Sequence, residues 1–334
     1  MMYHLLGACL ALAALLSLNA LASLLATGLW RSLARPARRW SAGTRARLIF
    51  VLRICPAVVA AACVCALLIP SYLTHEPRST GEVVSLKLAA LALLSSIGIA
   101  LALWRGLCAW RATRRLASNW LRHSEPIQLK DITIPAYRIR HSFPVIAVVG
   151  VLRPRLFISA QVFASLTDEE LSAALSHERA HLAVRDNLKR GLLRACRDVL
   201  TIVPCGRSLD HAWAEASEAA ADERAARAGA HVALSLASAL IKIARLAPAG
   251  VRPTMPAGAH LVGETAGCVA WRVRRLTQLA GIKGAFDGHG AYLLNLSIWS
   301  GLGAFLTALA LASTNARVLE TMHVMIEHAV SALM

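Results

Sequence analysis

Two histidines four residues apart, with a glutamate beside the first, occur in the sequence "SHERAH" at residues 176–181. On an α-helix, His177 and His181 lie on one face with their Cβ atoms about 5 to 6 Å apart, so both imidazoles can bind one Zn²⁺ at roughly 2.0 to 2.1 Å. In this pattern Glu178 does not bind the metal but takes a proton from the attacking water. The spacing therefore predicts two zinc ligands and a general base; the alternative is a chance pattern on a polar helix.

A catalytic zinc needs three protein ligands and an open fourth position, so a third side chain must come from another segment. The sequence "HAWAEASEAAADERAARAG" at residues 211–229 predicts a helix that carries Glu218 and Asp222 on one face. We assign Glu218 as the third ligand of one zinc ion per chain. Asp222 is assigned as an outer carboxylate that holds the N–H of a ligand histidine. Asp186 is either a second outer carboxylate or the cap of a helix that starts at residue 187.

Hydrolysis at such a zinc site also needs a group that stabilises the oxyanion and a surface that aligns the substrate. His211 and His141 are candidates for the first role, although no spacing selects either, and surface or loop histidines are the alternative. The apolar run at 144–152 is too short to span a bilayer as a helix and predicts a strand beside the site. Its backbone is expected to align substrate by strand addition, through Val145, Ile146, Ala147, Val148, Val149 and Gly150.

The helix that carries the two histidines has a complete start signal. Thr167 can cap it, Glu170 can reach back to the cap, and Leu166 can pack on Leu171 as a hydrophobic staple. Runs rich in β-branched residues predict strands before this helix, at 132–141, 143–152 and 153–160. Periodicity and caps predict further helices after it, at 187–202, 208–228, 231–246 and 263–279.

Composition favours an integral membrane protein over a soluble enzyme. Of 334 residues, 57% are hydrophobic and 16% are charged, and the mean hydropathy is +0.54. Four stretches have the roughly 20 apolar residues that a transmembrane helix needs: 5–30, 48–70, 83–104 and 291–312. We therefore expect a mainly α, integral membrane fold with a three-helix region (1–104), an α+β zinc domain (105–290), a fourth transmembrane helix (291–312) and a short extracytoplasmic tail (313–334).

Charge predicts the orientation. Arginines are concentrated after the first and third spans, at 31, 35, 38, 39, 45 and 47 and at 105, 111, 114, 115 and 122. By the positive-inside rule both segments are cytoplasmic, so the N-terminus lies outside and the zinc domain inside. Within the spans, Arg53 and Lys87 lie near an end and are expected to reach the headgroups, with a buried functional charge as the alternative. The eight cysteines show neither metal-like nor redox spacing.

Basic residues around and after the zinc motif contribute to a net charge of +17. They are expected to face an anionic inner leaflet, and binding of nucleic acid is the alternative. These residues are Arg185, Lys189, Arg190, Arg194, Arg197, Arg272, Arg274 and Arg275. The predicted partners are therefore the lipid bilayer and a protein substrate, without direct nucleic-acid binding.

Four segments together resemble a known family: "VVGVLRPRLFISA", "LTDEELSAALSHERAHLAVRDNLKR", "EASEAAADERAA" and "WRVRRL". They look like the membrane-bound zinc metallopeptidases related to the β-lactam sensor-transducers, the antirepressor peptidases of bacteria, and more distantly like the CAAX prenyl protease and HtpX families. The resemblance implies a gluzincin site, in which His177, His181 and Glu218 bind zinc, Glu178 is the base, and Asp222 and Asp186 support the ligands. It also implies the bacterial inner membrane, with the N-terminus outside.

One departure concerns sensing. The sensor-transducers carry a penicillin-binding domain after the fourth span with a Ser-x-x-Lys nucleophile, and this sequence contains no Ser-x-x-Lys. We therefore expect no covalent β-lactam sensing by the chain itself, and a signal that enters through the spans or through a separate sensor protein.

Three functions follow from these residues. The first is a zinc endopeptidase that cleaves a cytoplasmic repressor, as the resemblance implies. A neighbouring reading frame that encodes a winged-helix repressor would favour this function. The second is a membrane quality-control protease, for which deletion would cause many membrane proteins to accumulate. The third is a non-catalytic signalling scaffold with a structural zinc, which a proteolysis assay on a Glu178→Gln variant separates from an enzyme.

Overall fold

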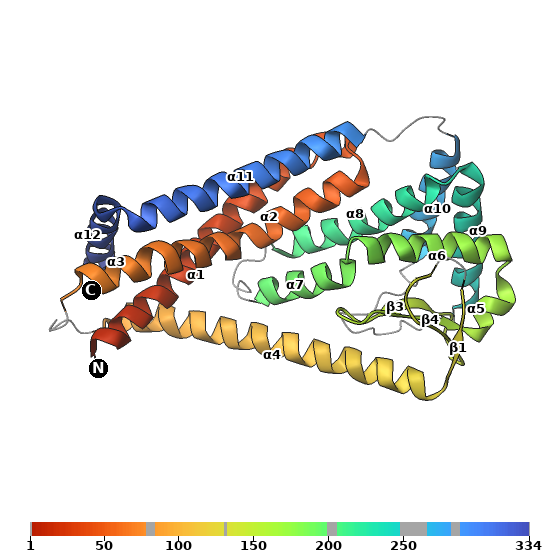
Figure 1. The fold of residues 1–334 in the computed structure, drawn as a ribbon, viewed down its shortest axis with the longest axis horizontal. Coiled ribbons are helices and arrows are strands. Elements are labelled where there is room, and N and C mark those ends of the chain that lie inside the picture. The colour runs from red at the N-terminus through yellow and green to blue at the C-terminus, as the bar shows by residue number, and fades with distance from the viewer. Residues whose placement is uncertain are drawn as a thin grey trace.

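The computed structural model describes residues 2–77, 84–129, 132–198, 206–247, 266–281 and 288–333. Most of these residues are helical, and one small sheet follows the third long helix. Figure 1 shows the sheet at one end of the molecule, together with the shorter helices α5 (Ala160–Ser165), α6 (Asp168–Ala183), α9 (Ala230–Leu246) and α10 (Ala266–Gly281). The third long helix, α4 (Leu86–Arg122), runs along the molecule from beside the N-terminus to the sheet. The arrangement separates an apolar bundle from the part of the chain that carries the "SHERAH" motif.

Within the described residues, four helical segments are long and apolar enough to cross a membrane: Met2–Leu33, Ala42–His75, Leu86–Arg122 and Leu296–Thr314. They correspond to α1 (Met2–Leu33), α2 (Ala42–Cys63) with α3 (Ile69–His75), α4 (Leu86–Arg122), and α11 (Gly288–Thr314). The prediction of four such helices is confirmed. The predicted start of the third span, at 83, lies outside the described residues.

The helical path from α2 to α3 widens into a π-helical stretch at Val64–Leu68. Pro70 follows this stretch and has no N–H to donate to the preceding turn, and a local change of hydrogen-bonding register is how helices accommodate such a gap. α4 has no break at the predicted boundary between 104 and 105 and continues to Arg122. Its second half therefore connects the membrane-length part directly to the sheet.

The predicted tail after the fourth span forms α12 (Ala316–Leu333), which packs against α3 and the N-terminal part of α1 (Figure 1). The Ser71 hydroxyl donates to the backbone oxygen of Leu319 at 2.7 Å, and the Tyr72 hydroxyl donates to that of Tyr3 at 2.7 Å. The two termini thus lie at the same end of the bundle, away from the sheet.

The sheet has four strands in the order β1-β2-β4-β3. They are β1 (Ser124–Ile127), β2 (Ala136–Ile139), β3 (Ile146–Val149) and β4 (Arg155–Ser159); β2 and β4 run parallel and the other pairs antiparallel. The three strands that the sequence predicts are present, with shorter bounds. β1 was not predicted, and its Pro126 is tolerated because β1 is an edge strand.

Both faces of the sheet are covered, which explains the continuous apolar run in β3. Ile146 and Val148 join a core formed with α6 (Asp168–Ala183) and α9 (Ala230–Leu246), whereas Ala147 and Val149 pack with Trp120 of α4. β3 lies at an edge of the sheet next to α6. The sheet therefore presents one strand edge to the helix that carries the histidines.

The start of α6 follows the prediction closely. Thr167 accepts a hydrogen bond from the Glu170 N–H at 3.3 Å, and the Glu170 carboxylate accepts one from the Thr167 N–H at 2.9 Å. Leu166 and Leu171 lie in the same core cluster. Glu170 also accepts from Ser238 and Lys242 of α9, both at 2.7 Å. The cap therefore also joins α6 to α9.

Shorter helices complete this part of the structure: α5 (Ala160–Ser165), α7 (Asp186–Asp198), α8 (Gly206–Ala226) and α10 (Ala266–Gly281). α8 lies against α2. Ile49 of α2 shares a core cluster with Leu193 of α7 and with Leu209, Trp213 and Ala216 of α8. The second membrane-length helix therefore shares an apolar core cluster with α7 and α8.

The prediction that Arg53 reaches the headgroups is wrong. Arg53 is only 4% exposed, and its Nε donates to Asp210 Oδ1 of α8 at 3.0 Å. A buried guanidinium is stable only when a carboxylate pairs with it, and Asp210 of α8 provides that carboxylate. Lys87, by contrast, lies exposed in the first turn of α4.

Candidate metal centre

Three side chains that can bind a metal converge between α6 and α8. His177 Nε2 lies 3.2 Å from His181 Nε2 and 3.6 Å from Glu218 Oε2, and His181 Nε2 lies 3.5 Å from Glu218 Oε1. All three residues are buried. A tetrahedral site with metal–ligand distances of about 2.0 to 2.1 Å places its ligands about 3.3 Å apart. Two imidazole nitrogens and one carboxylate at this spacing fit a zinc ion.

Two further carboxylates orient the imidazole rings. Asp186 Oδ2 lies 2.7 Å from His181 Nδ1, and Asp222 Oδ1 lies 2.9 Å from His177 Nδ1. An ionised carboxylate can only accept, so each Nδ1 carries the proton and each Nε2 is directed toward Glu218. Asp186 also begins α7 and accepts from Ser217 of α8 at 2.9 Å. The two predicted roles of Asp186 were an outer carboxylate and a helix cap, and the structure shows its contact with His181.

Glu178 is buried next to these ligands and points into a cavity. Its Oε2 has no hydrogen-bond partner among the described residues. Burial raises the pKa of Glu178 above its ordinary value. A carboxylate with a raised pKa and an unused oxygen is suited to accept a proton from a water molecule near the metal ligands.

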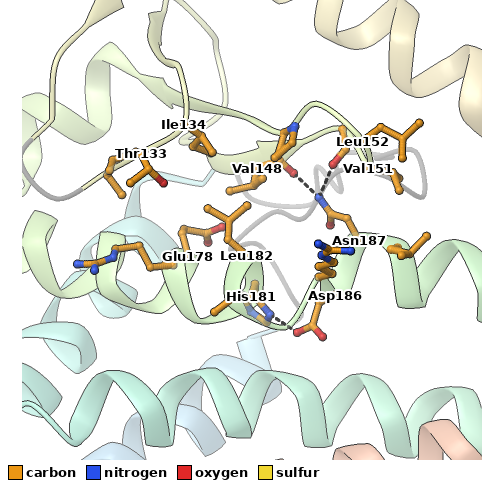
Figure 2. A pocket seen from close by; sticks show the side chains of 17 residues that line it. Thr133, Ile134, Val148, Val151, Leu152, Glu178, His181, Leu182, Asp186 and Asn187 are labelled. Carbon is orange, nitrogen blue, oxygen red and sulfur yellow. Dashed lines mark hydrogen bonds and ion pairs between the residues drawn. The ribbon is translucent and has the colours of Figure 1, made fainter.

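The cavity has a volume of about 690 Å³ and lies between α6, the start of α7 and β3. Figure 2 shows Glu178 and His181 on its helical side and Val148 on its strand side. Its lining is otherwise mainly apolar, with Ile132, Ile134, Val151, Leu152, Leu182 and Leu188. The cavity can therefore enclose an apolar segment of a peptide next to the base.

The strand proposed to align substrate borders this cavity. β3 pairs with β4 on one side only, and Val148 and Gly150 line the cavity. On the open side, the Asn187 amide donates to the backbone oxygens of Val148 at 3.0 Å and Gly150 at 3.1 Å (Figure 2). Asn187 thus joins the first turn of α7 to the strand edge, and its role was not predicted from the sequence.

The carboxylates set the charge of the histidines. Burial opposes protonation of His181, but Glu218 and Asp186 outweigh it and raise its pKa to about 9. Burial raises the pKa of Asp222, but Arg272 and His177 outweigh burial and lower this pKa to about 2. Asp222 is therefore ionised at neutral pH and can hold His177.

The prediction that the basic residues face lipid is wrong for Arg272, which is buried, while Arg190 and Arg275 are partly buried and paired with carboxylates. Arg272 is buried and contacts both Asp222 and Glu218, Arg190 donates to Glu218 Oε1 at 3.1 Å, and Arg275 pairs with Glu223. The sequence does carry a signal for Arg272. It falls on the same stripe of α10 as Val269, Val273 and Leu276, which pack into the core.

The two histidines proposed as oxyanion stabilisers lie apart from the ligands. His141 contacts Phe143 and Trp120 on the α4 side of the sheet. His211 is exposed, two turns before Glu218 on α8. Neither lines the cavity that Glu178 and His181 share.

Comparison with known proteins places the chain in a family. A search of curated proteins gives no match. A model of the family described as BlaR1 peptidase M56 matches residues 89–266, which is more than half of the chain and includes all three candidate metal ligands. The match agrees with the resemblance noted in the sequence, and with the four membrane-length helices. The chain therefore belongs to the BlaR1 peptidase M56 family of membrane metallopeptidases.

Proposed function

We propose that this protein is an integral-membrane zinc endopeptidase. The observation that carries the proposal is the cluster of His177, His181 and Glu218 at tetrahedral spacing, beside a buried Glu178 that opens on a cavity. Membership of a metallopeptidase family supports the same conclusion. A zinc ion held by these three residues would supply Lewis acidity, which polarises a peptide carbonyl and makes water more acidic.

The residues around the metal ligands have distinct parts in this mechanism. Glu178 accepts a proton from the attacking water and returns it to the leaving amine, as a general base and then a general acid. Asp222 and Asp186 hold the ligand histidines by their Nδ1 atoms. The edge of β3 at Val148 and Gly150 borders the cavity and aligns the substrate backbone beside the Asn187 amide, which holds the oxygens of both residues.

The proposed role is regulatory proteolysis at the bacterial inner membrane, with a cytoplasmic repressor as substrate. The arginine distribution supports a zinc domain that faces the cytoplasm and an N-terminus outside. A cytoplasmic site fits a repressor of the winged-helix class. The activating signal then arrives through the membrane helices or through a separate sensor protein.

The test compares the wild-type chain, Glu178→Gln and Glu169→Gln, each purified at full length. Glu169 is exposed on the first turn of α6 and provides the matched control. We measure bound zinc, and cleavage of fluorescent casein and of a winged-helix repressor encoded beside the gene. We expect one zinc per chain in all three proteins, and a loss of cleavage of about 10² to 10⁴-fold in Glu178→Gln alone.

Full cleavage by Glu178→Gln would contradict the mechanism. Absence of zinc from the wild-type protein would contradict the metal centre. Zinc binding without cleavage of either protein would favour the signalling scaffold over the enzyme. Cleavage of casein but not of the repressor would favour the broader protease of membrane quality control.

A further inference from the structure

A single guanidinium contacts three residues of the metal centre from α10. Arg272 donates through Nε and Nη2 to the two carboxylate oxygens of Asp222, at 2.9 and 2.6 Å. Its Nη1 lies 3.2 Å from Glu218 Oε2, and its Nη2 lies 3.3 Å from His177 Nε2. Arg272 is 3% exposed and lies beyond the segment that the family model matches.

The position of Arg272 is not explained by attraction of a metal. A positive charge a few ångströms from the ligands repels a divalent cation, and the low polarity of a buried site strengthens the repulsion. Burial of a guanidinium is also unfavourable unless the guanidinium is well paired. What Arg272 gains is a two-pronged contact with Asp222, which only the planar fork of an arginine can make. Its contribution must therefore be geometric.

The contacts form a chain that ends at the metal-binding nitrogen. Asp222 Oδ1 is shared by Arg272 Nη2 and by His177 Nδ1, at 2.6 and 2.9 Å. Because the guanidinium holds both oxygens, the Asp222 carboxylate cannot turn away from the ring. His177 Nδ1 is then fixed as a donor, and Nε2 stays directed at Glu218, whose own Oε2 contacts Arg272 Nη1.

We propose that Arg272 is a positioning residue of the metal centre, which acts through Asp222 and Glu218 to hold His177 and the carboxylate ligand in place. The inference rests on the proposed function, because it concerns the same site. It makes metal binding depend on the docking of α10 against α8. α10 precedes α11, the fourth membrane-length helix, so the residue that orients the ligands belongs to the segment next to that helix.

The test uses full-length protein in detergent, four single variants (Arg272→Lys, Arg272→Gln, Asp222→Asn and Arg274→Gln) and the double variant Arg272→Gln with Asp222→Asn. Arg274 is exposed on the same helix and is the matched control. Zinc affinity is measured by competition with a chromophoric chelator, and ligand geometry by the visible absorption spectrum of the Co²⁺ form. Thermal unfolding of the metal-free proteins identifies any variant that does not fold.

We expect Arg274→Gln to match the wild-type protein. Both Arg272 variants should bind zinc about 10 to 100-fold more weakly and show an altered Co²⁺ spectrum. Arg272→Lys is decisive because it keeps the charge and the fold but not the fork. The double variant Arg272→Gln with Asp222→Asn should lose clearly less than the product of the two single losses, because both changes break the contacts between Arg272 and Asp222.

Zinc affinity that is unchanged or higher in both Arg272 variants would overturn the proposal and leave only charge repulsion. Losses that multiply in the double variant would also overturn it, since Arg272 would then act independently of Asp222. Either result leaves the proposed function intact. If the wild-type protein itself binds neither Zn²⁺ nor Co²⁺, the proposed function fails together with this inference.

Discussion

Arg53 Nε donates to Asp210 Oδ1 at 3.0 Å, and this pair joins the second membrane-length helix to the helix that carries Glu218. A second link lies at the other end of α8, where the Glu223 carboxylate accepts from the Ala42 N–H at 2.9 Å. The two links lie about 20 Å apart along α8, at 1.5 Å per residue. Helix α8 is therefore fixed to α2 over most of its length.

The first prediction concerns the ion pair between Arg53 and Asp210. Asp210→Asn leaves Arg53 buried without its ionised partner, and we expect a loss of about 1 to 3 kcal/mol, less than for a fully buried pair because Asp210 is 20% exposed. The midpoint of thermal unfolding in detergent measures the loss. Adding Arg53→Met should recover part of it, since the unpaired charge is removed. A double variant less stable than Asp210→Asn would show that the pair does not act in this way.

The second prediction concerns the third ligand. Glu218→Gln removes the only carboxylate of the ligand cluster, and we expect zinc to bind more than about 100-fold more weakly, beyond the usual loss for an outer carboxylate. Metal content after dialysis against a weak chelator measures the effect. Glu215→Gln, an exposed position one turn earlier on α8, should retain zinc. Equal zinc in both variants would argue for a different ligand set.

The third prediction concerns pH and the start of α6. Burial disfavours ionisation of Glu170, but Lys242, Ser238 and the Thr167 N–H outweigh it and lower its pKa from 4.5 to about 2. Because the folded pKa is below the unfolded one, the stabilisation is complete above about pH 4.5 and is lost as the pH falls toward 2.

Glu170→Gln should therefore lower the free energy of unfolding by about 2 kcal/mol at neutral pH. The difference from wild type should shrink as the pH falls below about 4.5. Thermal unfolding at a series of pH values measures it. Glu169→Gln, on the exposed side of the same turn, should stay close to wild type throughout. A Glu170→Gln deficit that does not change with pH would exclude an ionised Glu170 as its cause.

The fourth prediction concerns orientation. The positive-inside rule places the segment after α4 in the cytoplasm and the C-terminus outside. Fusion of a phosphatase that is active only outside the membrane should give high activity after residue 334 and low activity after residue 122. Fluorescent-protein fusions, which mature only inside, should give the opposite pattern. A reversed pattern would exclude a cytoplasmic repressor as substrate.

Local signals explain why so much of the site could be predicted from the sequence. The capping residues of α6 and the spacing of His177 and His181 involve neighbours within one or two turns, which the sequence displays directly. Glu218 and Asp222 were found because a ligand and its supporting carboxylate also share a helical face. The long apolar helices needed only length and composition.

The features that were missed depend on partners far away in the sequence. Arg53 pairs across 157 residues and Arg272 across 50, so their charge suggested lipid until the carboxylates opposite them were known. β1 contains Glu125 and Pro126, which are rare in strands, and it exists because β2 offers a free edge. Asn187 resembles a helix-start residue, and only the fold reveals the two strand oxygens that it holds.

The apolar cluster around Trp213 bears on how this protein can be handled in solution. Ile49 and the partly buried Phe50 of α2 cover one side of α8, while the opposite side presents Glu218 to the histidines. A fragment without the first two long helices would expose Leu209, Trp213 and Ala216 to water, next to a ligand that must hold its place within fractions of an ångström. The second membrane-length helix thus backs the helix that carries Glu218, and we expect a peptidase fragment cut free of it to lose the geometry of its metal ligands.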